Sequence, residues 1–306
     1  MSKIYLNIAI IGAGKIAYSL VSSLIDSRFV VSIIISKNIS SAEKLARKFG
    51  VKKYSDDFRD IPISCNAFFL CIPDSQLNLV AKILSKRKFN FRNSLFVHMS
   101  GALTTSVLDA LDKKKALTAS FHIMQTFPSK KTIRISKIYV AIETNSEQAE
   151  RTLFSLANEL GLIPFKLMDR NKIFYHLAAV HASNFLVGNI FNSQRLFDNA
   201  KVKGVDFREI MFPIISSTFS NIKKYGASKS LSGPIERGEL QIIKKHLNAL
   251  KKIKNTTRVN IEALNYISQS LSLLALIEQS GVKLSTVQDI ICEYLLIELK
   301  SISSKI

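Results

Sequence analysis

Cysteine is scarce in this sequence of 306 residues, and Cys65, Cys71 and Cys292 form no CxxC or Cys/His pattern. Without such spacing the sequence predicts neither a disulfide framework nor a metal site, and the cysteines are expected in the core. Long apolar runs are also missing, and the first residues lead straight into a strand-like segment, with no room for a signal peptide. We therefore expect a soluble, cytoplasmic protein with no membrane contact.

Acidic residues are few as well. The chain has 23 Asp and Glu and 43 Lys and Arg, which gives a formal net charge of +20. Clustered cations would favour nucleic acid, since they neutralise phosphates and release counterions. The basic residues here form short, scattered groups, with no zinc-finger, helix-turn-helix or alternating basic and aromatic pattern. We predict no nucleic-acid partner, and a positive field that steers anionic ligands towards the protein.

Hydrophobic residues make up 47% of the chain, enough for the core of one large or two ordinary domains. In the first half, short apolar runs alternate with helical patterns, which predicts a parallel α/β sheet. The expected strands are 5–11, 30–36, 67–72, 94–99, 116–121 and 138–142, and the expected helices are 18–25, 41–49, 76–84, 105–111 and 146–160. Long helical patterns follow at 171–198, 207–225, 238–251, 258–280 and 285–300. The sequence therefore predicts a sheet domain at 1–165 and an all-α domain at 166–306.

A glycine turn, Gly12-Ala13-Gly14-Lys15-Ile16-Ala17, directly follows the first predicted strand. Gly12 lets the chain turn off the strand, Gly14 lets backbone N–H groups approach a pyrophosphate, and Ala17 keeps the next helix close to the sheet. The phosphates then lie at the helix N-terminus, where unpaired N–H groups and the helix dipole favour negative charge. Its position after a strand favours a dinucleotide site over a purely structural turn, and with it a Rossmann-like first domain.

Residues after the second and third predicted strands refine this cofactor site. Ser36 and Lys37 stand where an acidic residue would bind a free ribose 2′-hydroxyl. A hydroxyl and an ammonium suit a 2′-phosphate, so NADP(H) is predicted, with Lys37 as a plain solvated residue the alternative. Pro73 and Asp74 follow the strand at 67–72, near the expected nicotinamide end, although Asp74 could instead cap the helix at 76–84.

The histidines are the candidates for proton transfer, because imidazole titrates near neutral pH. His98 and His122 end neighbouring predicted strands, so both are expected at the cofactor edge of the sheet. His176 lies on the predicted helix at 171–198, where it could protonate the oxygen that forms as hydride arrives. The alternative is that His176 and His181 form hydrogen bonds within a domain interface.

The helix that carries His176 has further polar residues on one face. At about 100° per residue, His176 and Ser183 lie within about 20° of each other, and Asn184 lies between the directions of His176 and His181. Asn184 is therefore a candidate for orienting a substrate. Further along, Arg237 follows a Gly-Pro turn and could bind the carboxylate of a substrate, or that of Glu236 or Glu239.

Together these motifs resemble a family of NADP oxidoreductase-like proteins with a Rossmann-like domain and a helical C-terminal domain of unknown function. The resemblance covers nearly the whole chain and depends on the glycine turn, the Pro73-Asp74 loop and the segments 98–103, 121–127, 175–184 and 231–239. The chain departs from the family pattern at Ile123, where proline is usual, and at Glu239, where aspartate is usual. The loop after His122 is therefore expected to be less rigid than in the family.

The family's wider relatives include pyrroline-carboxylate reductases, deazaflavin-dependent NADP reductases and ketopantoate reductases. The resemblance implies NADPH-dependent reduction of a small 2-oxo acid, most concretely 2-dehydropantoate (ketopantoate) to pantoate in pantothenate biosynthesis, by a homodimer formed through the helical domain. An imine reductase of the pyrroline-carboxylate type and a non-catalytic NADP-binding protein are the alternatives. Pyrroline-carboxylate reductases carry a Ser/Thr-Pro-Gly-Gly run. This run is missing here, which argues against an imine reductase of that type.

The resemblance also bears on the identity of the acid. A lysine on the first helix of the second domain acts as the acid in the hydroxy-acid relatives. Here His176 stands at the matching place and Lys172 one turn earlier, so the identity of the acid stays open. In this hypothesis His176 supplies the proton, Asn184 and Ser100 hold the carbonyl and hydroxyl groups, and Arg237 anchors the carboxylate. The remaining candidates are His122 for catalysis and His181, Ser183 and Glu236 for substrate binding.

Overall fold

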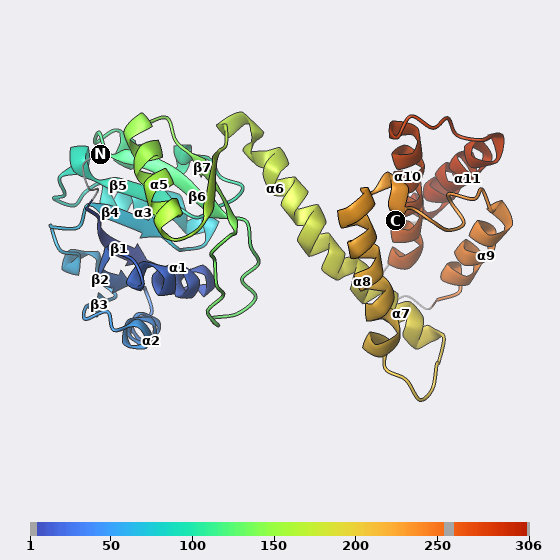
Figure 1. The fold of residues 1–306 in the computed structure, drawn as a ribbon, viewed down its shortest axis with the longest axis horizontal. Helices are drawn as coiled ribbons and strands as arrows, with labels where there is room; N and C mark the ends of the chain where they lie inside the picture. The colour runs from blue at the N-terminus through green and yellow to red at the C-terminus, as the bar shows by residue number, and fades with distance from the viewer. Residues whose placement is uncertain (1–4, 254–259, 305–306) are drawn as a thin grey trace. The chain divides into compact units, whose positions relative to one another are not determined.

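The structure, a computed structural model, describes residues 5–253 and 260–304. The chain forms two compact units, residues 1–187 and 188–306, and each is described here by itself (Figure 1). The division falls within the helix Leu186–Asn199 (α7), later than the boundary at 165/166 that the sequence suggests.

The first unit contains the Rossmann-like sheet that the sequence predicts. Its described strands follow the order β3-β2-β1-β4-β5-β6-β7-β8, and every neighbouring pair is parallel except β6 and β7. The strands are Asn7–Ile11 (β1), Val30–Ile35 (β2), Tyr54–Ser55 (β3), Ala67–Leu70 (β4), Leu95–His98 (β5), Leu117–Ile123 (β6), Tyr139–Glu143 (β7) and Ile163–Lys166 (β8). The sheet is mainly parallel, as predicted; β7 is the exception, because residues 124–138 form no crossover helix and the chain returns antiparallel to β6.

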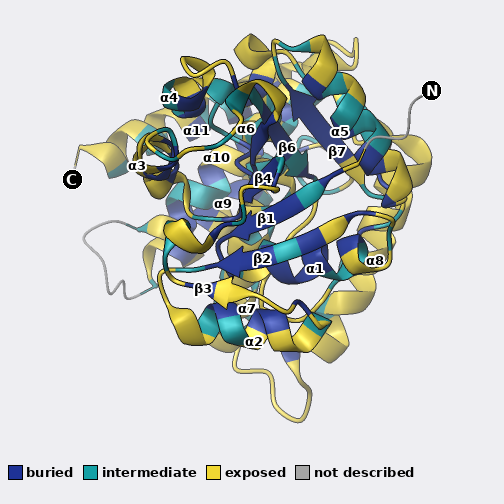
Figure 2. Cartoon of the chain, turned by 90° about the vertical axis from the view of Figure 1, so that its left-hand side faces the viewer, coloured by how far each residue is buried: buried dark blue, intermediate teal, exposed yellow. Residues whose placement is uncertain are grey.

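Helices cover both faces of this sheet. They are Lys15–Ile25 (α1), Ile39–Phe49 (α2), Asp74–Leu84 (α3), Asp109–Asp112 (α4) and Glu147–Glu159 (α5), with short 3₁₀ turns at Phe58–Asp60, Phe91–Asn93, Thr105–Leu108 and Asp169–Asn171. Along β1 the side chains alternate: Ile8 and Ile10 pack in the cluster that includes α1, α2 and α5, whereas Ala9 and Ile11 pack in the one that includes α3. Figure 2 shows the central strands dark blue, as expected for a parallel sheet buried on both sides.

The helix predicted at 171–198 is interrupted. The chain forms Lys172–Val180 (α6), then a π-helical turn at His181–Phe185, and then α7. A π turn takes an extra residue, so the relative directions calculated at 100° per residue do not carry across it. The calculated directions therefore hold only as far as Val180, and the alignment of His176 with Ser183 and Asn184 on one face stays a prediction.

The second unit is helical, as predicted, and has its own apolar core. After α7 come Phe207–Tyr225 (α8), a 3₁₀ turn at Ser228–Ser230, Leu240–Lys251 (α9), Ile261–Gln279 (α10) and Thr286–Ser303 (α11). The bounds of α8 match the prediction because Asp206 and Glu209 form a capping box at its start. Part of the helix predicted at 258–280 lies outside the described residues. The core includes Ile243, Leu247, Ile267, Ile291 and Leu295.

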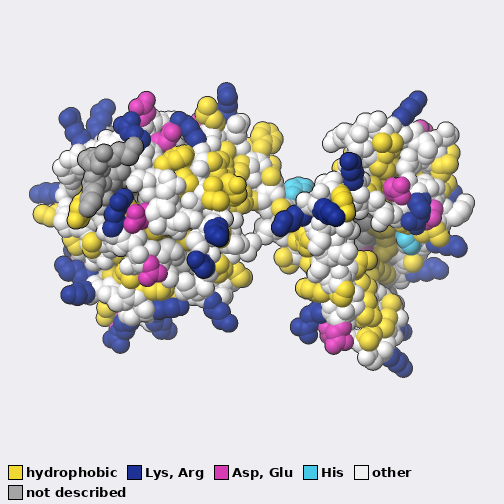
Figure 3. Space-filling model, in the orientation of Figure 1, with side chains coloured by type: hydrophobic (Ala, Val, Ile, Leu, Met, Phe, Trp, Pro, Cys, Tyr) yellow, Lys and Arg dark blue, Asp and Glu magenta, His cyan; other side chains and the backbone are white. Residues whose placement is uncertain are grey.

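Cys65 and Cys71 are buried, as the sequence predicts, and Cys292 is half-buried. Across residues 5–253 and 260–304, no helix has the length and apolar character needed to span a membrane, and no cluster of His, Cys, Asp and Glu is arranged to hold a metal ion. Figure 3 shows Lys and Arg side chains dispersed over the visible face of each unit. This dispersal agrees with the scattered basic groups of the sequence.

Candidate active site

The glycine turn joins β1 to α1 as predicted. Gly12 has φ +107°, and a Cβ there would lie 2.3 Å from the carbonyl oxygen of Cys71, so only glycine fits. Gly14 is the N-cap of α1, and no side chain caps the first turn of this helix. Its N–H groups therefore remain available to a phosphate, and the turn fits the pyrophosphate of a dinucleotide.

The residues after β2 fit a 2′-phosphate. Ser36 is partly exposed and Lys37 is exposed, while Asn38 caps α2 by accepting a hydrogen bond from the Ser41 backbone N–H at 3.0 Å. Among the described residues, no acidic side chain lies in this turn. The Ser36 hydroxyl and the Lys37 ammonium group are therefore the groups that could bind a 2′-phosphate. The β1–β4 neighbourhood, where the strand order reverses, is the place at which open α/β sheets bind ligands.

The loop after β5 is held by Ser100. Its hydroxyl donates to Asp74 Oδ2 at 2.7 Å and accepts from the backbone N–H groups of Ala102 and Leu103 at 3.2 and 3.0 Å. Asp74 thus lies in the first turn of α3 and binds Ser100, rather than capping that helix. Because these contacts occupy the Ser100 hydroxyl, its role is to shape the loop, and the predicted contact with substrate is not supported.

Two histidines converge on Gly101 in this loop. A Cβ on Gly101 would lie 2.7 Å from His122 Nε2 and 2.9 Å from His176 Nδ1, so a side chain here would collide with both rings. The two ring centroids are 6.4 Å apart. His122 comes from β6 and His176 from α6, and the structure therefore brings two of the predicted catalytic residues together at the edge where β1, β4 and β5 end.

Tyr175 fixes the orientation of His122. Its hydroxyl lies 3.1 Å from His122 Nδ1, and the two rings are perpendicular at 5.5 Å. Burial, with the neighbouring charges of His176 and Lys172, lowers the pKa of His122 to about 4, and burial raises the pKa of Tyr175 to about 12. At neutral pH both groups are uncharged, and when the phenol donates to Nδ1 the imidazole keeps its proton on Nε2, beside Gly101.

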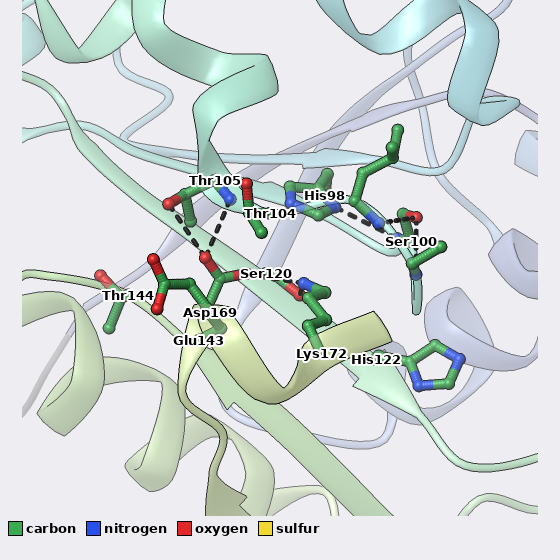
Figure 4. A network of polar contacts seen from close by, with 12 residues as sticks. His98, Ser100, Thr104, Thr105, Ser120, His122, Glu143, Thr144, Asp169 and Lys172 are labelled. Carbon is green, nitrogen blue, oxygen red and sulfur yellow. Dashed lines mark hydrogen bonds and ion pairs between the residues drawn. The ribbon is translucent and has the colours of Figure 1, made fainter. Parts of the chain in front are cut away.

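A buried ion pair lies at the start of α6 (Figure 4). Lys172 Nζ is 2.7 Å from Glu143 Oε2 on β7 and also donates to the Ser120 hydroxyl on β6. Glu143 Oε1 accepts from the backbone N–H and the hydroxyl of Thr105 at 2.9 and 3.1 Å. The sheet thus supplies two partners to the Lys172 ammonium group, and burial lowers the pKa of Lys172 despite the contact with Glu143.

His98 is a second buried imidazole at this edge. It is fully buried at the end of β5, and its Nδ1 accepts from the Ser100 backbone N–H at 3.2 Å. Burial, followed by the charge of Lys172, lowers the pKa of His98 to about 3. His98 is thus neutral and helps to position the Ser100 loop.

The other predicted site residues lie on the π turn and in the second unit. His181 and Asn184 are exposed on the π turn, Ser183 is half-buried, and the His181 ring packs on Phe185 at 4.7 Å. In the second unit, Arg237 forms a two-point ion pair with Glu239 at 2.8 and 3.1 Å. This is the internal salt bridge that the sequence left open.

The Glu236 side chain, also in the second unit, is exposed, and its backbone carbonyl accepts from Gln288 Nε2 at 2.9 Å.

Sequence reasoning missed Gly101, Tyr175 and Glu143. Gly101 and Tyr175 belong to segments on which the family resemblance depends, but no local sequence pattern indicates what either residue does. Glu143 gives one signal, an acidic residue at the end of the apolar strand β7. A buried carboxylate requires a partner, and that requirement could have pointed to Lys172.

Models of two known protein families match this chain, one in the first half of the sequence and one mainly in the second half. Residues 7–97 match the family model described as "NADP oxidoreductase coenzyme F420-dependent", and residues 138–263 match DUF2520, a domain of unknown function. No curated protein matches the chain.

Among solved structures, a Bacteroides fragilis protein assigned as an NADP oxidoreductase is 22% identical over 88% of this chain and 97% of its own, with a TM-score of 0.73. A Thermotoga maritima protein is 25% identical over 90% and 99%, with a TM-score of 0.66. An Aspergillus terreus reductive aminase, solved with NADPH, is 13% identical over 99% of both chains, with a TM-score of 0.57. The first and third likenesses concern the fold alone.

The family match begins at β1 and includes the glycine turn, whose open helix N-terminus fits the phosphates of the cofactor. Ser36 and Lys37 provide the polar groups that a 2′-phosphate needs. The chain is therefore an NADP-dependent oxidoreductase, whose residues 7–97 match the F420-dependent NADP oxidoreductase model and whose residues 138–263 match DUF2520.

Proposed function

We propose that this protein reduces a small 2-oxo acid with NADPH, most concretely ketopantoate to pantoate. The observation that carries the proposal is the convergence of His122 and His176 on Gly101, at the sheet edge that also bears the glycine turn. Bound NADPH supplies the hydride that a carbonyl carbon accepts. Two imidazoles at the same edge supply what the carbonyl oxygen then requires, a hydrogen-bond donor and a proton.

In this proposal His176 gives the proton to the oxygen and His122 donates a hydrogen bond to it. The Nδ1 atom of His176 is buried and has no hydrogen-bond partner among the described residues, which suits a group that binds a substrate atom. His122 stays neutral because its pKa is about 4, and Tyr175 holds its ring in place. Asn184 and Ser183, on the π turn, remain candidates for orienting the substrate.

Charges of both signs lie near the two histidines. Burial is the main cause that lowers the pKa of His98 and His122, and the ammonium group of Lys172 adds to it, while Asp74 acts in the opposite direction at His122. Because Glu143 pairs with Lys172, the proposal of an anionic substrate does not rest on the charge of the site. Lys172 acts here through its field and through the position of α6, because its Nζ is engaged by Glu143 and Ser120.

Imine reduction is the second candidate, and the fold shared with the NADPH-bound reductive aminase favours it. A panel assay separates the two: NADPH oxidation is followed with ketopantoate, other 2-oxo acids and cyclic imines. Turnover of ketopantoate is expected, and its absence would refute that substrate. Tight NADPH binding with no turnover of any compound would instead support a non-catalytic NADP-binding protein.

His176→Gln tests the role of the proton donor. We expect kcat for the substrate found in the panel to fall by about 10²- to 10⁴-fold, the usual contribution of general acid catalysis. The Kd for NADPH, measured by fluorescence, is expected to stay within about twofold, because His176 is not part of the glycine turn. An unchanged kcat would show that another group supplies the proton.

We also propose that the protein is a homodimer that works in the cytoplasm, without a nucleic-acid or membrane partner. Support for the dimer comes from α8, which exposes Phe212, Ile214, Phe219, Ile222 and Tyr225. Contiguous exposed apolar residues of this kind are typical of protein–protein interfaces.

A further inference from the structure

A cavity of about 1060 Å³ lies within the helical unit, among residues of α7, α9 and α10. Its volume is just above the range of about 300–1,000 Å³ that is usual for pockets that bind small molecules. Its polar lining includes Asn189, Asn192, Arg195, His246, Glu262 and Tyr266. None of these residues belongs to the site of His122 and His176, so the cavity is a separate feature of the fold.

Arg195 and Glu262 form the charged centre of this cavity. The Glu262 side chain, in the first turn of α10, is only 2% exposed, and its Oε1 lies 2.8 Å from Arg195 Nη2. The contact is an ion pair without hydrogen-bond geometry, since Oε1 accepts no hydrogen bond among the described residues. A carboxylate buried this deeply requires a cation beside it, and Glu262 therefore holds Arg195 in place.

The Arg195 guanidinium keeps donors for a ligand. The side chain is 34% exposed, and its Cζ lies 6.0 Å from the ring centroid of Phe191, one turn earlier on α7. In the part of the chain that the structure describes, Glu262 is the sole ion-pair partner of Arg195, and no hydrogen bond uses its remaining N–H groups. A guanidinium fixed from behind by a carboxylate presents a planar fork to a carboxylate or phosphate group.

Polar contacts between helices hold the walls of the cavity. His246 Nδ1 on α9 is 3.0 Å from the Tyr266 hydroxyl on α10, and Asn265 Nδ2 on α10 donates to Asn189 Oδ1 on α7 at 3.4 Å. Asn260 Nδ2 donates to the Leu250 carbonyl at 3.0 Å, which ties the end of α9 to the start of α10. These contacts link the three helices that line the cavity.

We propose that this cavity binds a small organic anion, whose carboxylate or phosphate group pairs with Arg195. Lys252 also lines the cavity. With Arg195 and Lys252 positive and Glu262 negative, the charged residues that line the cavity have a net positive charge. The carboxamides of Asn192, Asn199 and Gln269 provide hydrogen bonds for the rest of the ligand. A cationic ligand is disfavoured, because the one lining carboxylate is buried behind Arg195.

Isothermal titration calorimetry of the full chain tests the proposal with two probes, citrate for the carboxylate source and inorganic phosphate for the phosphate source. Saturating NADP⁺ fills the phosphate-binding turn of the first unit, so that the heat reports other sites. We expect one probe to bind with one site per chain. Arg195→Lys keeps the charge but loses the fork, and Asn192→Asp adds a negative charge to the lining; each is expected to weaken binding at least tenfold.

Arg208→Lys is the matched control, because Arg208 is an exposed residue of α8 paired with Asp206, outside the cavity. Its binding is expected to equal that of the wild type. The proposal is overturned if neither probe binds at one site per chain, or if the Arg195 and Arg208 variants behave alike, which would report diffuse attraction to the net charge of +20. Should Arg195→Lys fail to fold, as judged by circular dichroism, Asn192→Asp decides. The titration involves no turnover, so failure of the proposed reductase activity leaves this result intact.

Discussion

Gly101 limits what the candidate site can tolerate at a single position. In Gly101→Ala, the new methyl group would lie under 3.0 Å from ring atoms of both His122 and His176, so the rings must move. We expect kcat to fall by about 100-fold, the effect of misplacing catalytic groups by about 1 Å, while NADPH binding is kept. Steady-state kinetics and a cofactor titration measure the two quantities.

Gly188→Ala is the matched control for this prediction. Gly188 lies within α7, and a Cβ there would meet no atom within 4 Å. The substitution is expected to leave kcat unchanged and to raise the free energy of unfolding by up to about 1 kcal/mol, because alanine favours helix over glycine. Equal kinetics for the two alanine variants would contradict the role given to Gly101.

The buried histidines make stability depend on pH. Burial lowers the pKa of His98 to about 3 and that of His122 to about 4, whereas unfolded imidazoles titrate near 6.5. Below pH 6.5 the unfolded chain therefore binds more protons than the native one. The free energy of unfolding is expected to fall with decreasing pH, with a slope approaching about 1.4 kcal/mol per pH unit for each histidine.

Urea unfolding between pH 7 and 5 measures this slope before most carboxylates titrate. His98→Asn removes one of the two groups and is expected to reduce the slope by about half, whatever it does to stability at pH 7. A slope that stays the same in this variant would show that His98 is protonated in the native state.

Single residues also mark the limit of what the sequence could predict. Gly12 and Gly14 were predictable because a turn between strand and helix needs those residue types at neighbouring positions. His122 and His176 were candidates from the sequence because His122 follows a predicted strand and His176 lies on the polar face of a predicted helix. Their meeting at Gly101 was not predictable, since it depends on the packing of α6 against β6, which no local pattern encodes.

At the scale of elements, the pair of Lys172 and Glu143 tethers α6 to the sheet. Both side chains are almost fully buried, so Lys172→Met leaves a carboxylate without its partner. We expect the free energy of unfolding to fall by about 3–5 kcal/mol, as for other buried pairs that lose one member. Urea denaturation followed by circular dichroism gives the value.

The exposed pair of Lys166 and Glu150 provides the comparison. Lys166 and Glu150 are 2.6 Å apart, about as close as Lys172 and Glu143, but the Lys166 side chain is 54% exposed. Lys166→Met is therefore expected to lower the free energy of unfolding by less than about 1 kcal/mol. If both methionine variants lose the same small amount, Lys172 does not hold α6 in place.

Elements were predicted best where an apolar repeat and a cap coincide. The bounds of α8 were predicted correctly, and the six expected strands all exist, because apolar runs and capping residues mark them locally. The π turn at His181–Phe185 and the antiparallel β7 were missed. Both depend on how distant segments pack. In addition, a π turn contains only one residue more than an α-helical turn, which hardly alters the apolar pattern of a helix.

At the scale of the whole molecule, the pattern of apolar residues predicted a sheet domain followed by a helical domain, and both are observed. The sequence could not show which apolar residues of the helices remain outside the core. On α8, Ile214 is 62% exposed and Phe219 48%, although both fit the apolar pattern of a helix that packs. Burying a side chain of this size contributes about 1.5–3 kcal/mol, so a second copy that covers several of them gains a substantial free energy.

We therefore expect sedimentation equilibrium to show a dimer at micromolar concentration. Ile214→Glu is expected to shift the protein towards the monomer, because a carboxylate in a dry interface loses its hydration without a partner. Ile63→Glu is the control, since Ile63 is 84% exposed on a loop of the first unit, whereas α8 belongs to the second unit. A wild-type monomer at high concentration would refute the dimer, and equal association of the two glutamate variants would place the interface elsewhere than α8.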